Sequence, residues 1–275
     1  MKIASFNIQR FGPKKASDPH IIWILAKIVS RYDIILILEL VDRSGSAIKI
    51  LLKALNKGNK NNQYSLKISR RLGRSSYKEQ FVFLYRNNLV DLVDTYQFDD
   101  IGTLSYDVFA RDPYIVRFKC LTSELDFVLI PVHTTPEEAE AELDKLHEVF
   151  MDVKEKWQTD NIMILGDFNA DGSYLSEAHM NMIRIRSDED FHWLISDDQD
   201  TTTSTMNTNT YDRIVVYGDD MFQAVVPGSA KPFNFQEAYG LSDERALDVS
   251  DHYPVEVTLE CSTPYDEEGK RWNSL

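Results

Sequence analysis

The chain has 275 residues, of which 43% are hydrophobic and 27% are charged, so its size and composition suit one large globular domain. It carries 30 Lys and Arg against 44 Asp and Glu, and this net charge of −14 argues against a protein that binds nucleic acid tightly by neutralising phosphates. No apolar run approaches the roughly 18–20 residues that span a bilayer, and no signal peptide is recognisable at the N-terminus.

Patterns of apolar residues predict strands and helices along the whole chain. From the N-terminus, alternation predicts a strand over 2–8, helical spacing predicts helices over 21–32 and 47–55, and a solid apolar run predicts a buried strand over 33–40. Thr135 as N-cap and Pro136 at the first helical position predict a long helix from 136 to about 157. The other predicted strands are 81–85, 115–121, 127–132, 162–165, 213–217, 222–226 and 255–259.

No repeat, low-complexity segment or linker divides the chain. Strands flanked by helices in both halves predict an α/β fold, in which two mainly antiparallel sheets pack face to face between outer helices as a four-layer α/β/β/α sandwich. We therefore expect one domain over residues 1–261 and a polar C-terminal tail, residues 262–275, that frays.

Polar side chains recur where the predicted strands end. Asp167 and Asn169 follow the strand 162–165, and Asp251 and His252 precede the strand 255–259. Oxygen ligands and imidazoles in such positions suit a hard divalent cation and a phosphate ester. Asp and Asn also begin turns, so neither segment alone excludes a structural role.

Five further polar residues lie at strand ends, namely Asn7, Glu39, Glu79, His133 and Asp212. Each has an alternative interpretation: the carboxylates could be solvated strand ends, His133 could be a half-buried residue before a helix, and Asp212 could pair only with Arg213. The functional interpretation depends on their recurrence. The other histidines, His20, His147, His179 and His192, are predicted on helical or loop segments as structural or exposed residues.

Six segments, in this order, resemble the deoxyribonuclease I family of the endonuclease/exonuclease/phosphatase superfamily over residues 2–259: FNIQRFG, LGRSSYKE, PVHTTP, GDFNAD, TYDRIV and SDHYPVEV. SGSAI, HTTP and FHW are more similar to the muscle-type (X-linked) and gamma paralogues than to the pancreatic enzyme. The resemblance implies a monomeric, metal-dependent endonuclease that hydrolyses double-stranded DNA to 5′-phosphate and 3′-hydroxyl ends. The alternatives are another phosphoesterase of this superfamily, or a non-catalytic DNA- or actin-binding relative.

The resemblance also implies a role for each residue of the site. His133, oriented by Glu79, and His252, oriented by Asp212, would act as general base and general acid, in an order that the sequence does not decide. Mg²⁺ (or Mn²⁺) and the scissile phosphate would be held by Asn7, Glu39, Asp167, Asn169 and Asp251. The DNA backbone would be contacted by Arg10, Arg74, Tyr77, Arg111 and Tyr174. Asp200 and Thr202 resemble a structural Ca²⁺ loop.

The chain departs from the family pattern at several positions. Gly172 and Asn209 stand where the family usually has a disulfide, which predicts a looser region over 171–209. Val41 replaces an arginine that reads the minor groove in the pancreatic enzyme. Weak or absent actin binding is expected, because Tyr64, Ser65 and Leu66 preserve that surface only partly.

The sequence says little about the state of the cysteines or the compartment of the protein. Cys120 and Cys261 are the only cysteines, and two buried or idle thiols are favoured over a disulfide because the spacing shows no framework pattern. The family resemblance implies a secreted or endomembrane protein whose signal has been removed, while a cytoplasmic location is not excluded.

Overall fold

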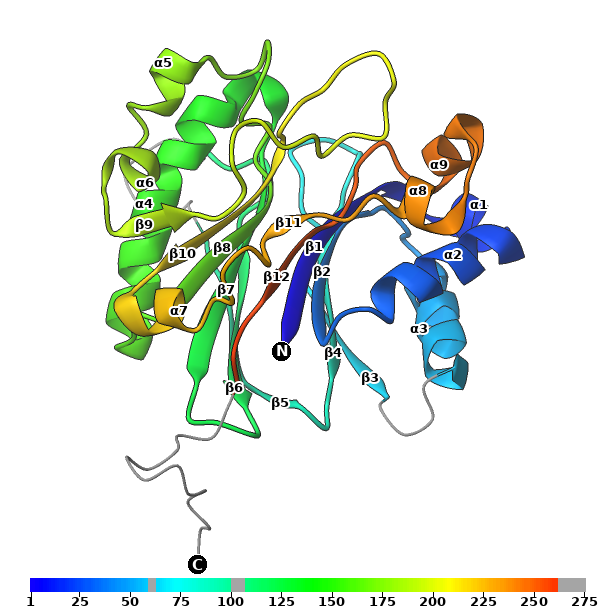
Figure 1. The fold of residues 1–275 in the computed structure, drawn as a ribbon, viewed down its shortest axis with the longest axis horizontal. Coiled ribbons are helices and arrows are strands. Elements are labelled where there is room, and N and C mark those ends of the chain that lie inside the picture. The colour runs from blue at the N-terminus through cyan, green and yellow to red at the C-terminus, as the bar shows by residue number, and fades with distance from the viewer. Residues whose placement is uncertain (59–62, 100–106, 262–275) are drawn as a thin grey trace, which may run out of the picture.

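The structure is a computed structural model that describes residues 1–58, 63–99 and 107–261. Two six-stranded sheets pack face to face, and helices cover the outer face of each (Figure 1). The predicted α/β sandwich with mainly antiparallel sheets is therefore confirmed. The predicted tail, residues 262–275, lies outside the described residues.

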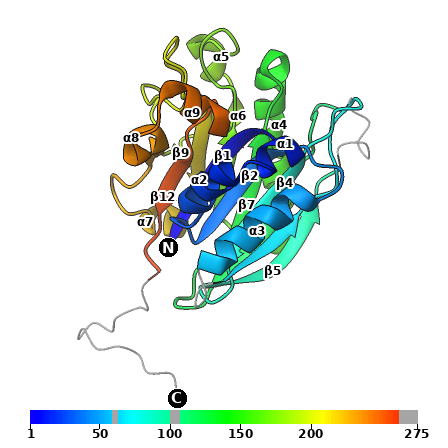
Figure 2. The ribbon, with the colours of Figure 1, turned by 90° about the vertical axis from the view of Figure 1, so that its right-hand side faces the viewer.

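The first sheet has the strand order β11-β12-β1-β2-β4-β3. Its only parallel pair is β1 with β2. Five helices cover its outer face, and Figure 2 shows α2 and α3 lying across it. The strands are β1 (Lys2–Phe11), β2 (Ile34–Leu40), β3 (Tyr64–Ile68), β4 (Gln80–Arg86), β11 (Lys231–Pro232) and β12 (Val255–Thr258). The helices are α1 (Pro13–Ala16), α2 (Pro19–Val29), α3 (Ser46–Gly58), α8 (Phe235–Tyr239) and α9 (Asp243–Val249).

The second sheet has the order β5-β6-β7-β8-β10-β9, and its only parallel pair is β7 with β8. The strands are β5 (Val90–Gln97), β6 (Tyr114–Cys120), β7 (Asp126–His133), β8 (Ile162–Asp167), β9 (Phe191–Trp193) and β10 (Asp212–Tyr217). The helices of this half are α4 (Ala139–Trp157), α5 (Glu177–Met180), α6 (Arg184–Ser187) and α7 (Asp219–Gln223), with a short 3₁₀ turn over Pro136–Glu138.

The central strands are solidly apolar because both of their faces are buried. In β2, Leu36 and Leu38 enter the core between the two sheets, while Ile35 and Ile37 pack under the helices of the first sheet. A strand covered on both sides needs apolar residues at every position, which explains the run that the sequence shows there. A buried polar residue inside a strand, such as Glu256, has ionic and hydrogen-bonding partners, whereas the polar residues of the site lie at strand ends.

Three predictions about elements were wrong. The long helix begins at Ala139 instead of residue 136, because Pro136–Glu138 forms a 3₁₀ turn and Thr135 makes no side-chain cap. Residues 222–226 are no strand: Gly218, at φ 93°, ends β10, and two aspartates then begin α7. His192 lies on the short strand β9, paired with β10, instead of on a helix or loop.

Within residues 1–58, 63–99 and 107–261, no helix combines the length and apolar composition needed to cross a bilayer.

Candidate active site

The register of the second sheet aligns three of the predicted site residues. Asp167, the last residue of β8, pairs with His133 of β7 on one side and with Asp212 of β10 on the other. Gly166 before it has φ 145°, and a Cβ there would lie 1.9 Å from the carbonyl oxygen of Val132. Only glycine allows this close approach of β8 to β7, so the glycine of the GDFN segment fixes the position of Asp167.

The first histidine is held between a carboxylate and the centre of the site. His133 Nδ1 lies 2.7 Å from Glu79 Oε2, and the other oxygen of Glu79 accepts a 2.9 Å bond from Arg111. Burial opposes a charge on the imidazole, but the Glu79 carboxylate outweighs it and raises the pKa of His133. Burial also opposes the charge on Glu79, but His133 and Arg111 together lower the pKa of this carboxyl to about 2. Glu79 is thus an anion at neutral pH, and it orients the ring.

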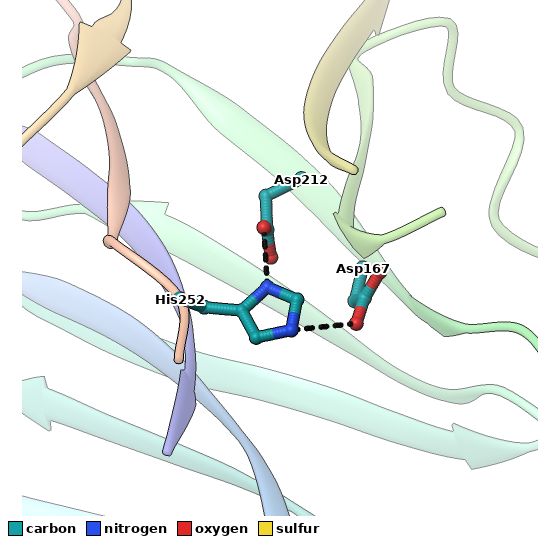
Figure 3. A group of neighbouring side chains, drawn as sticks. All are labelled: Asp167, Asp212 and His252. Carbon is teal, nitrogen blue, oxygen red and sulfur yellow. Dashed lines mark hydrogen bonds and ion pairs between the residues drawn. The ribbon is translucent and has the colours of Figure 1, made fainter. Parts of the chain in front are cut away.

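The second histidine is held in the same manner from the other side (Figure 3). His252 Nδ1 lies 2.7 Å from Asp212 Oδ2, and its Nε2 faces Asp167 Oδ2 at 3.6 Å. Burial opposes a charge on this ring too, but the carboxylates of Asp212 and Asp167 raise the pKa of His252 well above its usual value. Burial and the neighbouring Asp167 raise the pKa of Asp212.

Both imidazoles therefore converge on one carboxylate oxygen. His133 Nε2 lies 3.8 Å from Asp167 Oδ2, and His252 Nε2 lies 3.6 Å from the same atom. In each ring the Nδ1 atom is held by a carboxylate, so Nε2 is the atom that can exchange a proton with a bound group. Two such rings can act on opposite sides of a group held near Asp167, one removing a proton and the other supplying one.

The predicted metal ligands lie together beside these rings. Asn7 Nδ2 donates to Glu39 Oε1 at 3.0 Å and to Asp167 Oδ2 at 3.1 Å, and the backbone N–H of Asn169 donates to Asp167 Oδ1. Asp251 Oδ1 is buried and accepts no hydrogen bond within the described part of the chain. An all-oxygen donor set with an unsatisfied carboxylate oxygen fits a hard divalent cation such as Mg²⁺.

The backbone is strained at the same place. Positive φ angles at non-glycine residues occur at five positions among the described residues, and four of them belong to the site. These four are Gln9, Arg10, Glu39 and Asn169. Such conformations cost about 1–3 kcal/mol each and persist where surrounding contacts enforce them, which is common at active sites.

Three residues that help to build the site were not predicted as site residues. Gln9 Nε2 donates to Asp251 Oδ2 at 2.8 Å, and Ser250 Oγ donates to the carbonyl of Asn7 at 2.6 Å. Lys15 Nζ donates to the carbonyls of Ile8, Gln9 and Val249 at 2.8, 2.6 and 2.8 Å. Gln9 and Ser250 lie inside the recognisable motifs, but Lys15 has no signal of its own in the sequence.

The predicted DNA-contacting residues fall into two groups. The Arg10 guanidinium lies over the exposed Tyr77 ring, 5.9 Å from its centroid, and the exposed Tyr174 packs against Tyr211 with centroids 5.5 Å apart. Both contacts are connected to the histidine pairs: Tyr77 is two residues before Glu79 in sequence, and the ring centroids of Tyr211 and His252 are 6.3 Å apart.

The two other arginines already have protein partners. Arg111 donates to Glu79 and to the carbonyl of His133, so it acts within the first histidine pair. Arg74 forms an ion pair with Glu138 at 2.6 Å and donates to the backbone carbonyls of Asp107 and Val108. A phosphate would have to compete with Glu138 for Arg74.

The predicted calcium loop lies directly against the second histidine. Asp200 Oδ1 accepts hydrogen bonds from the backbone N–H and hydroxyl of Thr202, and Thr202 pairs with His252 in an isolated β-bridge. The hydroxyl of Thr201 accepts from the backbone N–H of Asp212 at 3.2 Å. This threonine-rich segment therefore supports both members of the His252–Asp212 pair.

Gly172 and Asn209, the positions without the family disulfide, are neighbours in space. A Cβ on Gly172 would lie 2.7 Å from Asn209 Oδ1. Asn209 thus occupies the space beside the missing side chain, and the looser 171–209 region stays a prediction. Val41, which replaces the groove-reading arginine, lies against Gly12 below the strained turn of β1.

Comparisons with known proteins show the family of the chain. A model of the endonuclease/exonuclease/phosphatase family matches residues 4–252. The chain is 46% identical to deoxyribonuclease-1 of Bos taurus over 261 residues, which cover 94% of this chain and 92% of the bovine protein. It is 43% identical to deoxyribonuclease gamma of Homo sapiens over 272 residues, which cover 98% and 89%. These identities are too similar to place the chain nearer to one of the two.

Solved structures share the fold at low sequence identity. A family member from Leptotrichia buccalis C-1013-b superposes with a TM-score of 0.66 at 16% identity, covering 94% of this chain and 99% of that one. A conserved protein from Enterococcus faecalis V583 superposes with a TM-score of 0.65 at 18% identity, covering 94% and 99%.

Proposed function

Since the chain belongs to the endonuclease/exonuclease/phosphatase family and, within it, to the deoxyribonuclease I family, we propose that it is an endonuclease that hydrolyses the phosphodiester bonds of DNA. The observation that carries this proposal is the pair of His–carboxylate dyads facing Asp167 in a chain 46% identical to a deoxyribonuclease. Hydrolysis of a phosphodiester requires activation of water, charge stabilisation at phosphorus and protonation of the leaving oxygen.

The two histidines supply the proton transfers. One imidazole Nε2 accepts a proton from water as the water oxygen bonds to phosphorus, and the other donates a proton to the departing 3′ oxygen as the P–O3′ bond breaks. The products are a 5′-phosphate and a 3′-hydroxyl. Glu79 and Asp212 hold the rings through Nδ1 and stabilise the imidazolium form.

We propose Mg²⁺, or Mn²⁺, as the cofactor, with Glu39, Asp167 and Asp251 as its carboxylate ligands and Asn7 and Asn169 as amide neighbours. When bound, the cation would neutralise charge on the phosphate oxygens. Asn7 supports this assignment because it joins two of the carboxylates through its amide. Structural Ca²⁺ at Asp200 and Thr202 is a second metal proposal, testable by the effect of Ca²⁺ on the melting temperature of Asp200→Asn.

Double-stranded DNA would lie across the exposed Arg10–Tyr77 and Tyr174–Tyr211 contacts. Arginine forks bind phosphate and aromatic rings pack against the sugar–phosphate backbone, so these side chains have suitable chemistry. We also propose that the protein acts in a secreted or endomembrane compartment, as the relationship to deoxyribonucleases favours. This location is tested by measuring whether the cells that naturally produce the protein release it into their culture medium.

Weak or absent inhibition by actin is a further part of the proposal. Tyr64 is 3% exposed and its hydroxyl donates to the carbonyls of Val29 and Tyr32, so it serves the core of the first sheet. The inhibition is measured by adding monomeric actin in increasing concentration to a plasmid-nicking reaction. Inhibition at sub-nanomolar actin would contradict the proposal of weak or absent actin binding.

The decisive test is nicking of supercoiled plasmid by the purified protein in Mg²⁺ plus Ca²⁺ and in EDTA. We expect metal-dependent nicking that falls by about 100-fold or more in His252→Ala, since one general acid–base group contributes roughly 10²–10⁴-fold. His179→Ala is the matched control, because the imidazole of His179 is exposed and its ion-pair partner among the described residues is Glu140. If no divalent metal ion supported nicking, the proposal would be wrong. Phosphomonoester substrates would then be tested.

A further inference from the structure

The two cysteines of the chain are neighbours at the end of the sandwich opposite to the active site. They are 141 residues apart in sequence, but their side chains lie close enough for each to affect the pKa of the other. Thr122 joins the same group: its hydroxyl lies 3.3 Å from Cys120 Sγ and donates to the Cys261 carbonyl at 3.3 Å. Figure 1 shows the end of β12 reaching β6 at this place.

Backbone hydrogen bonds fix the position of each cysteine. Cys120 is the last residue of β6, pairs with Val90 of β5, and donates its N–H to Leu125 at 2.9 Å. Cys261 directly follows Glu260, whose N–H donates to Ala224 at 2.7 Å. The fold therefore holds both cysteines beside Thr122, close to each other and far apart in sequence.

The distance from the active site follows from the strand register. Lys119 beside Cys120 pairs with Asp126, at the opposite end of β7 from His133. Thr258, near Cys261, pairs with Lys2, at the start of β1 and away from Asn7. A bond between the cysteines would leave the residues of the proposed reaction untouched.

We propose that Cys120 and Cys261 form an intramolecular disulfide when the chain meets a disulfide oxidant such as glutathione disulfide. The thiolate of one cysteine attacks the oxidant, which releases one glutathione thiol and leaves a mixed disulfide. The thiolate of the other cysteine then attacks the cysteine sulfur of that mixed disulfide and releases the second glutathione thiol. The two cysteine thiols lose two hydrogens, and one glutathione disulfide becomes two glutathione thiols.

The two thiols differ in exposure and in acidity. Cys120 is only 3% exposed, so an external oxidant reaches Cys261 more easily. Burial opposes the Cys120 thiolate, but the hydroxyls of Ser123 and Thr122 outweigh it and lower the pKa of Cys120. Burial and the neighbouring Cys120 raise the pKa of Cys261 to about 12, so Cys120 supplies a thiolate more readily at neutral pH.

The bond would tie the first sheet to the second. Cys261 follows β12 of the first sheet, and Cys120 ends β6 of the second, so the disulfide would close a loop of about 140 residues. Closing so long a loop restricts the unfolded chain strongly. It would replace, at another site, the family bridge that Gly172 and Asn209 cannot form.

The test equilibrates the full, reduced protein in glutathione buffers from reducing to oxidising, quenches it with acid, labels free thiols with a maleimide and records the intact mass. We expect conversion to an unlabelled monomer lighter by two hydrogens, with a peptide cross-linked between Cys120 and Cys261. Its melting temperature should exceed that of the reduced form by roughly 5–10 °C.

The variants Cys120→Ser and Cys261→Ser are the matched controls. Each should keep one thiol that takes the label or glutathione, and neither should gain stability on oxidation. Full double labelling of the wild type in the most oxidising buffer would overturn the proposal. The proposal would also be overturned if the oxidised wild type carried only glutathione adducts or only disulfides between two chains. Both results are measured on the wild type, so they do not depend on whether a variant folds.

Discussion

At the residue scale, the two histidine–carboxylate pairs have the same 2.7 Å bond but different electrostatic surroundings. Glu79 also pairs with Arg111, whereas the described residues provide Asp212 with no arginine partner. The pKa of Glu79 is consequently lowered to about 2, while burial and Asp167 raise the pKa of Asp212. The two pairs should therefore contribute to stability with opposite dependence on pH.

Replacement of Glu79 by Gln should reveal the first of these contributions. A carboxyl with a lowered pKa stabilises the fold fully above its unfolded pKa of 4.5 and loses that contribution as the pH falls toward its folded pKa of about 2. At pH 6 we expect Glu79→Gln to be less stable than wild type by on the order of 3 kcal/mol. This difference should shrink between about pH 4.5 and pH 3, measured by denaturant unfolding across that range.

Asp212→Asn provides the matched control for that experiment. Because the folded pKa of Asp212 is raised, ionisation of this carboxyl disfavours the fold, so acidification should stabilise the wild type relative to this variant, which is opposite in sign to the change expected at Glu79. Parallel stability curves for Glu79→Gln and the wild type over the acid range would show that Glu79 is not held as an anion.

At the element scale, the sequence predicts the elements that are buried on both sides or strongly periodic. The apolar runs at β2 and β8 and the helical spacing at α2 and α4 are examples. The edge strands β3 and β5 gave no signal, because YSLKI and VDLVDTYQ keep one polar face toward solvent. Short helices such as α9 were missed for lack of two full turns of pattern.

The same reasoning separates the predictable from the unpredictable part of the site. Asp167 and His252 are visible because polar residues interrupt apolar strands. The residues that place them act across the chain: Gln9 reaches Asp251 over 242 positions, and Lys15 reaches Val249 over 234. Contacts between residues so far apart leave no local pattern in the sequence, so they are recognised only in the folded structure.

Lys15→Met should show what such a linking residue does. The Lys15 ammonium fastens α1 to the strained turn of β1 and to the end of α9, and burial lowers its pKa to about 8. Methionine would leave three carbonyls without their donor, so we expect a loss of about 2–4 kcal/mol in unfolding free energy. Displacement of Gln9 and Asp251 should lower kcat for nicking by roughly 10-fold or more.

Lys14→Met is the control, since Lys14 is exposed in the same helical turn. Denaturant unfolding and plasmid nicking over a range of Mg²⁺ concentrations give both readouts. Equal stability and equal kcat in the two variants would refute the linking role of Lys15.

At the scale of the whole molecule, an acidic chain must act on a polyanion. The net charge of −14 repels DNA at long range, but the Debye length of about 8 Å at physiological salt limits this repulsion to the near surface. Attraction must come from local cations, and two of the predicted arginines are already paired, Arg74 with Glu138 and Arg111 with Glu79. Arg10 has no ion pair within the described residues, so few phosphates would be neutralised.

This balance sets the salt dependence of the reaction. Each neutralised phosphate contributes about −0.9 to the slope of log affinity against log salt, so with one or two such contacts we expect a slope of roughly −1 to −2 for kcat/KM. Nicking measured from about 50 to 300 mM NaCl at constant free Mg²⁺ gives this slope, and Arg10→Gln should make it shallower by about one. A slope steeper than about −5 would mean that the chain binds DNA through many phosphate contacts on a basic surface. That result would contradict the prediction, because the net charge is −14 and two of the arginines are already paired.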